Sequence, residues 1–186
     1  MSKFWLAVKD GLEAISYFFV VVGILFGVVQ YLTFLKTNRQ QIAVSYILEF
    51  QADEMVQARL NLQRHWYVYP VAAISGKIGS SDVIDQLAMS FIFPGKKVQT
   101  DDLVRVVDFL DLIGACVRES VCDEITIHRH FGTYSRNLYC LYQAPLERLR
   151  KEYILTHLGL AMRDMIIANQ KVSQVSSNSG VNCSIR

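Results

Sequence analysis

The sequence has little proline and long stretches without glycine, and this scarcity leaves room for long helices. Its three prolines are Pro70, Pro94 and Pro145, and no glycine lies between Gly27 and Gly76. Proline and glycine are the residues that most often end a helix. No alternation of apolar and polar residues is long enough to predict a strand. The sequence therefore predicts an all-α protein.

The chain also lacks an excess of charge of one sign. It has 19 basic and 17 acidic residues, a formal net charge of +2. This balance gives no general electrostatic basis for binding a polyanion, so we expect no nucleic-acid partner. A glycine-rich phosphate loop, a nucleophile elbow and a kinase signature are all missing. We therefore predict no enzymatic activity, no cofactor and no small-molecule substrate.

One long uncharged segment stands near the N-terminus. Residues 14–35 number 22, of which 17 are hydrophobic, and no charge lies between Glu13 and Lys36. At about 1.5 Å per residue a helix here is roughly 33 Å long, enough to cross a hydrocarbon core of about 30 Å. A signal peptide has a shorter apolar stretch and a cleavage site of small residues, which this segment lacks. We predict a short N-terminal segment, 1–13, and then an uncleaved transmembrane helix in an inner or plasma membrane.

The orientation of this span rests on weaker features. Lys3 and Lys9 precede it and Lys36 and Arg39 follow it, so the positive-inside count is a tie. Acidic residues offset the first pair, and the four cysteines lack the tight spacing of a disulfide framework. Both features favour a single-pass protein whose C-terminal domain is cytoplasmic.

Three residues of the span are candidates for contact with another helix. Gly23 and Gly27 have the GxxxG spacing that lets two helix backbones approach closely. Gln30 lies on nearly the same face, where its amide would form a hydrogen bond across a dimer. The alternative is that the glycines face lipid. We expect the partners of the chain to be the lipid bilayer and either another protein or a second copy of itself.

Residues 36–172 are predicted to form a small bundle of five or six helices, and the serine-rich tail 173–186 is expected to be disordered. The first helix continues from the span, unbroken or slightly broken, to about His65. Its predicted apolar stripe is Val44, Leu48, Met55, Ala58 and Leu62. Further helices are expected at 82–93, from an N-cap at Thr100 to Glu119, at 124–131 after the N-cap Asp123, at 134–144 and at 145–171, with Gly132 and Pro145 as the breaks between the last three.

Two clusters of polar side chains allow a catalytic or metal-binding interpretation. Glu124 and His128 are one helical turn apart, but His130 points to another side, so we predict no metal site. Asp108 and Asp111 are paired carboxylates without the rest of an acid–base site.

Ion pairs with Arg105 or Arg118 are the simpler interpretation for these two carboxylates.

Cys116 and Cys122 are too far apart for a CxxC redox pair and are expected to be simply buried. Trp66 and its neighbouring tyrosines fit either the headgroup boundary or the bundle interior, and a straight helix favours the interior.

The segment 106–152 resembles an uncharacterised bacterial family of small proteins with one N-terminal membrane helix and a helical cytoplasmic domain. The likeness extends to 50–63 and is carried mainly by packing positions and helix caps. These are Asp108, Phe109, Leu112, Ile113, Gly114, Asp123, Glu124, Phe131, Gly132 and the segment 145–151. The resemblance implies no activity, cofactor or site residue.

These features predict a membrane-anchored protein-interaction module, a scaffold or regulator, at the inner face of the membrane. The alternative hypothesis is an anchored effector of a bacterial defence or toxin system that perturbs the membrane or acts with a partner enzyme.

Overall fold

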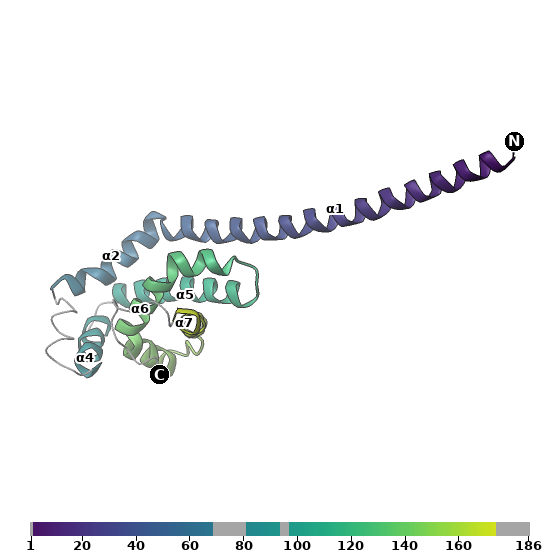
Figure 1. Ribbon diagram of the computed structural model, residues 1–186. Coiled ribbons are helices and arrows are strands. Elements are labelled where there is room, and N and C mark those ends of the chain that lie inside the picture. The colour runs from purple at the N-terminus through teal and green to yellow at the C-terminus, as the bar shows by residue number, and fades with distance from the viewer. Residues whose placement is uncertain (1, 69–80, 94–96, 174–186) are drawn as a thin grey trace. The chain divides into compact units, whose positions relative to one another are not determined.

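The computed structural model describes residues 2–68, 81–93 and 97–173, and it confirms an all-α chain (Figure 1). Within these residues there is no strand. The helices are α1 (Ser2–Phe50), α2 (Asp53–Val68), α4 (Ser81–Ile92), α5 (Lys97–Arg118), α6 (Glu124–Glu152) and α7 (Leu160–Ser173). The chain divides into two compact units, Met1–Gln41 and Ile42–Arg186.

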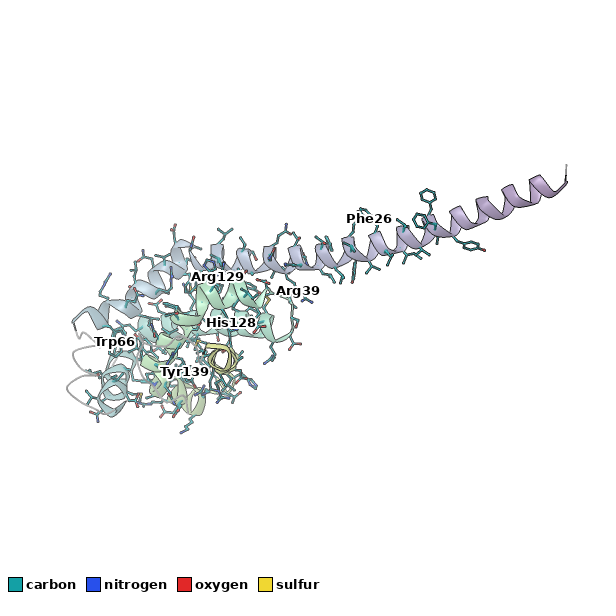
Figure 2. All side chains as sticks on the ribbon, viewed as in Figure 1. Phe26, Arg39, Trp66, His128, Arg129 and Tyr139 are labelled. Carbon is teal, nitrogen blue, oxygen red and sulfur yellow. A yellow bond between two sulfur atoms is a disulfide. The ribbon has the colours of Figure 1, made fainter. Side chains whose placement is uncertain are left out.

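The first unit consists of the N-terminal part of α1, whose large apolar side chains are exposed from Tyr17 to Phe34. Within the stretch Tyr17–Phe50, the most apolar window of 18 residues has a mean hydropathy of 2.3, so the helix is long and apolar enough to cross a membrane. None of its most apolar window is buried, unlike the core helix of a soluble domain. Phe26, for example, is 63% exposed and stands clear of the ribbon in Figure 2. The predicted span therefore coincides with an exposed apolar helix.

The second unit begins at the end of α1, where one part of the predicted apolar stripe is wrong. Val44 and Leu48 are exposed, whereas Ala43 and Phe50 are buried. The chain leaves the helical path at residues 51–52 and re-enters it as α2, so one periodicity cannot run through both helices. Within α2 the predicted positions Met55, Ala58 and Leu62 are buried, as expected. The prediction of a slightly broken helix is confirmed.

Helix α5 packs against both α2 and α7, while α6 packs against α4 and α7. The inner face of α5 is fully buried and consists of Leu103, Val106, Leu110 and Ile113. The predicted start at Thr100 is wrong, because α5 begins at Lys97. The Thr100 hydroxyl instead donates to the carbonyl of Ile92, 3.0 Å away, and so joins α5 to the end of α4.

Helix α6 is one long element where the sequence predicted breaks. Gly132 is buried inside it and does not end it. The helix bends at Tyr142, whose backbone is non-helical at φ −118° and ψ 18°. Pro145 lies one turn later, and its missing N–H and its ring disturb the preceding turn. The break that the sequence predicted at Pro145 is therefore present but lies three residues earlier, at Tyr142, and Pro145 stands in the first turn after it. Asp123 is the N-cap as predicted, accepting a hydrogen bond from the backbone N–H of Thr126.

The helix predicted at 145–171 is in fact two helices separated by residues 153–159. Ile154 at φ 60° and Gly159 at φ 77° both have left-handed backbones, which a continuing helix does not allow. This connection, the 153–159 loop, forms part of the site described below. The connection predicted at 66–81 and the tail from residue 174 lie outside the described residues, apart from the ends that belong to helices.

Aromatic side chains fill the centre of the domain. Phe50 stacks on Phe109 with ring centroids 5.6 Å apart and meets Phe131 edge-on at 5.1 Å. The Arg59 guanidinium lies 4.0 Å from the centroid of the Phe50 ring. The buried ring of Tyr139 lies inside the bundle (Figure 2). These contacts hold the end of α1 against α5 and α6.

Trp66 belongs to the interior, as the sequence favoured. Its indole N–H donates to the Tyr142 hydroxyl at 2.9 Å, and that hydroxyl donates to the carbonyl of Leu62 at 2.9 Å. Burial raises the pKa of Tyr142 well above its ordinary value. The kink of α6 is thus tied to α2 by a buried hydrogen-bond chain.

Candidate functional site: an apolar groove with an acidic rim

A groove with a volume of about 880 Å³ lies where the end of α4, the first half of α5 and the end of α6 meet. This volume is within the range of about 300–1,000 Å³ typical of ligand pockets. Its residues fall into two classes, an apolar floor and a polar rim. The floor consists of Ile92, Phe93, Val104, Leu149, Tyr153 and Leu155, and the rim of Thr100, Asp101, Arg105 and Asp108.

The aromatic wall of the groove is held by a cation. Phe93 and Tyr153 stack with ring centroids 6.4 Å apart. The Arg148 guanidinium lies 4.3 Å from the centroid of the Phe93 ring and donates to a Glu152 carboxylate oxygen at 2.7 Å. Because Arg148 is held from both sides, its charge is already paired and the aromatic wall is preformed.

The 153–159 loop gives the groove an exposed apolar edge. Tyr153 is 55% exposed, Ile154 87% and Leu155 36%. A left-handed backbone is unusual and costly for a β-branched residue such as Ile154, and surrounding structure must hold it in place. Strained residues of this kind cluster at binding and switch sites.

The loop is fixed from behind by two hydrogen-bonding side chains. Asp111 on α5 accepts hydrogen bonds from the backbone N–H groups of Gly159 and Met162, the latter at 2.8 Å. These are donors at the start of α7, so Asp111 caps a helix to which it does not belong. Arg150 donates to the Leu158 carbonyl at 2.9 Å. The strained edge of the groove therefore has a rigid base.

A close helix contact supports the same base. A Cβ on Gly114 of α5 would lie 2.6 Å from the carbonyl oxygen of Ala161 on α7. Only glycine allows the two backbones to approach this closely. The position is buried, and its glycine therefore sets the distance between α5 and α7.

The structure gives the two carboxylates different surroundings, although the charge of Asp108 still contributes to raising the pKa of Asp111. Asp111 is a helix cap, and burial raises its pKa, although the N–H groups of Met162 and Gly159 oppose the rise. Asp108 lies on the rim, and partial burial raises its pKa also. Asp111 therefore caps α7, whereas Asp108 faces the groove.

The ion pairs expected for these carboxylates are also wrong. Arg105 pairs with Glu54 of α2 at 3.7 Å, and Arg118 pairs with its neighbour Glu119 at 3.1 Å. The groove does not join the charged residues Glu54 and Arg59 to Asp108, because only Asp108 of the three lines it.

The histidines of α6 do not form a metal centre in the described part of the chain. His128 Nε2 lies 3.4 Å from a Glu124 carboxylate oxygen, and His130 is exposed. No group of three His, Cys, Asp or Glu side chains lies close enough to hold an ion among residues 2–68, 81–93 and 97–173.

Cys116 and Cys122 are buried, as expected, but they have a role that the sequence did not predict. Cys116 and Cys122 form a disulfide across the turn between α5 and α6, with Cα atoms 5.4 Å apart. The turn brings them together because the backbone N–H groups of Val121 and Cys122 both donate to the Cys116 carbonyl. Cys140 is disulfide-bonded as well. Wide spacing along a helix was misleading because the chain reverses between the two residues.

The predicted contact residues of the span lie on an open surface. A Cβ added at Gly23 or Gly27 would meet no atom within 4 Å, and Gln30 is exposed. The assignment of these three residues to a helix–helix contact stays a prediction.

Comparisons of this chain with protein-family models, with curated proteins and with solved structures found no match. The resemblance of 106–152 to an uncharacterised bacterial family therefore stays a prediction.

Sequence reasoning missed the groove. Its floor residues are scattered over three helices, and ordinary core positions have the same pattern. One signal was present in the segment 153–155, where Tyr, Ile and Leu follow a run of charged residues and break the polar periodicity.

Proposed function

We propose that the chain is a membrane-anchored protein-interaction module and that the groove is its binding surface. The observation that carries this proposal is the exposed apolar edge at Tyr153, Ile154 and Leu155 beside a preformed apolar floor. Apolar surface rimmed by polar residues is typical of a protein contact. The anchor would be the exposed apolar part of α1, which holds the domain at the bilayer.

A pull-down with a matched pair of variants tests this function. Full-length protein with an affinity tag is extracted from membranes in mild detergent as wild type, Leu155→Asp and Ile125→Asp. Ile125 is the control because it is 69% exposed and does not line the groove. We expect the same partner to be recovered with wild type and Ile125→Asp and to be lost with Leu155→Asp.

Two results would contradict the proposal. One is reproducible recovery of the chain with no partner and no self-association. The other is full retention of the partner by Leu155→Asp. Thermal unfolding of each variant checks that a lost partner does not reflect a lost fold.

The side of the membrane is a separate proposal. The sequence predicted a cytoplasmic domain, but the Lys and Arg count is a tie and acidic residues contribute little to this rule. The cysteines no longer support a reducing compartment, since Cys116 and Cys122 are bonded. Disulfides persist in oxidising compartments and are rare in the cytoplasm. We therefore propose that the helical domain lies on the oxidising side of the membrane.

Thiol trapping in intact cells tests this orientation. Cells are quenched in acid and treated with a maleimide of high mass before and after reduction. We expect Cys116 and Cys122 to react only after reduction, and a reporter fused after Arg186 to be active only outside the cytoplasm. Free thiols in the quenched sample, together with a reporter active inside, would restore the cytoplasmic assignment.

A further inference from the structure

We propose that the groove binds a short peptide segment of the partner that presents a large apolar side chain next to a lysine or arginine. This inference rests on the proposed function and adds the chemistry of the partner. It follows from the apolar floor and from the charges along the rim.

The floor selects an apolar anchor. Ile92 and Leu149 are buried at its base and Val104 is partly buried beside them. A volume of about 880 Å³ admits the side chains of a short segment rather than a whole packed helix. Burying one large aliphatic or aromatic side chain removes apolar surface from water, which makes it the main attractive contact.

The rim selects a cation. Asp101 and Asp108 both line the groove, and neither forms an ion pair within the described part of the chain. The rim cation Arg105 is already paired with Glu54 at 3.7 Å. The rim thus carries two carboxylates, Asp101 and Asp108, and one guanidinium, Arg105, whose charge is paired outside the groove. The rim therefore has a surplus of negative charge.

Of the two rim carboxylates, Asp108 has a charge that burial destabilises. Partial burial raises its pKa, which means that its charged form is short of stabilising partners. A basic side chain from a ligand would supply that partner. An acidic ligand would add repulsion at the same point.

The aromatic wall does not compete for the ligand's cation. Arg148 already occupies a face of the Phe93 ring at 4.3 Å and is held there by Glu152. The basic group of a ligand is therefore directed to the carboxylates, while its apolar group enters between the wall and Leu155.

A binding experiment with three probe peptides tests the proposal. The full chain is placed in nanodiscs of neutral phosphatidylcholine, and fluorescence anisotropy follows a short labelled peptide of leucine and lysine. Its twins carry glutamine or glutamate at the lysine positions. We expect the lysine peptide to bind about tenfold more tightly than the glutamine peptide, because two partly exposed charge contacts contribute about 0.7 kcal/mol each.

Matched variants locate the binding. Asp101→Asn with Asp108→Asn should bring the lysine and glutamine peptides within about twofold of each other. Glu49→Gln with Glu119→Gln removes two exposed carboxylates elsewhere and should leave the preference unchanged. Leu155→Asp should abolish binding of the apolar peptides.

The outcomes separate the two proposals. Equal binding of the three peptides, lost in Leu155→Asp, would overturn the basic chemistry and leave the groove as a docking surface. A preference for lysine that survives the Asp101 and Asp108 substitutions would place the charge contact elsewhere and overturn this inference. No binding of any probe to the groove, in a chain that still recovers its partner, would overturn both the chemistry and the site.

Discussion

Replacing Gly114 with alanine tests whether the contact between α5 and α7 sets the position of the groove's edge. The new Cβ would lie 2.6 Å from the Ala161 carbonyl oxygen and 2.7 Å from its carbonyl carbon. Ordinary contact begins near 3.4 Å, so the two backbones must separate by about 3.4 − 2.6 = 0.8 Å. Both obstructing atoms are backbone atoms, and no side-chain rotation relieves the overlap.

The change in the free energy of unfolding of Gly114→Ala has three parts: overpacking, a lost hydrogen bond and a gain in helix propensity. Overpacking of this kind costs roughly 1–3 kcal/mol. A shift of this size also lengthens the 2.8 Å bond from the Met162 N–H to Asp111 beyond hydrogen-bonding distance, at about 1 kcal/mol or more. Alanine's better helix propensity returns about 1 kcal/mol. We expect a net loss of roughly 1–3 kcal/mol.

Thermal unfolding of the full chain in mild detergent measures this loss. For a chain of this size about 1 kcal/mol lowers Tm by roughly 2–4 °C, so Gly114→Ala should lower it by roughly 2–12 °C. Gly23→Ala is the matched control, since its Cβ meets no atom within 4 Å. A melting temperature for Gly114→Ala within about 1 °C of wild type would refute the close contact.

Three further predictions follow from other contacts of the domain. Asp111→Ala leaves the N–H groups of Gly159 and Met162 without their acceptor, which should lower the free energy of unfolding by roughly 2–4 kcal/mol. Hydrogen exchange at these two amides should become faster, and unchanged exchange would contradict the cap. Burial raises the pKa of Tyr134 from 10.0 to about 12, so the unfolded chain loses this proton first and stability should fall between about pH 10 and 12. Tyr134→Phe should flatten that decline in urea titrations at alkaline pH, and an equal slope would argue against burial of the hydroxyl. Gly23→Leu should weaken crosslinking between copies of the chain in membranes if the GxxxG face pairs, whereas unchanged crosslinking would indicate that the glycines face lipid.

Much of the fold follows from local rules that the sequence states directly. The uncharged segment after Glu13 predicts the apolar part of α1, and Asp123 predicts the start of α6 because its side chain can satisfy a free N–H. Helix α5 keeps its apolar stripe over its buried length. These elements depend on nearest neighbours along the chain.

The elements that sequence reasoning missed depend on tertiary contacts. Gly132 was predicted to end a helix, yet it is buried within α6, which continues through it. The break predicted at Pro145 lies instead at Tyr142, where a buried hydroxyl donates to the Leu62 carbonyl. The sequence does not show this contact between distant segments.

The candidate site was hidden for the same reason. Asp111 looks like the partner of Asp108 in the sequence, three residues apart on one helix, and becomes a cap only because α7 begins against it. The disulfide between Cys116 and Cys122 depends on a turn whose course the spacing does not reveal. Such contacts between distant segments need the packed structure.

Photo-crosslinking in living cells tests the central claim, that the groove holds a protein partner at the membrane, most directly. A photoreactive phenylalanine analogue replaces Leu155 at the groove in one strain and Ile125 outside it in another. We predict a discrete adduct with a partner from position 155 alone, joined to a partner segment that contains a large apolar residue beside lysine or arginine. Adducts of equal yield from both positions, or none from position 155 in a chain that still recovers its partner, would contradict the account.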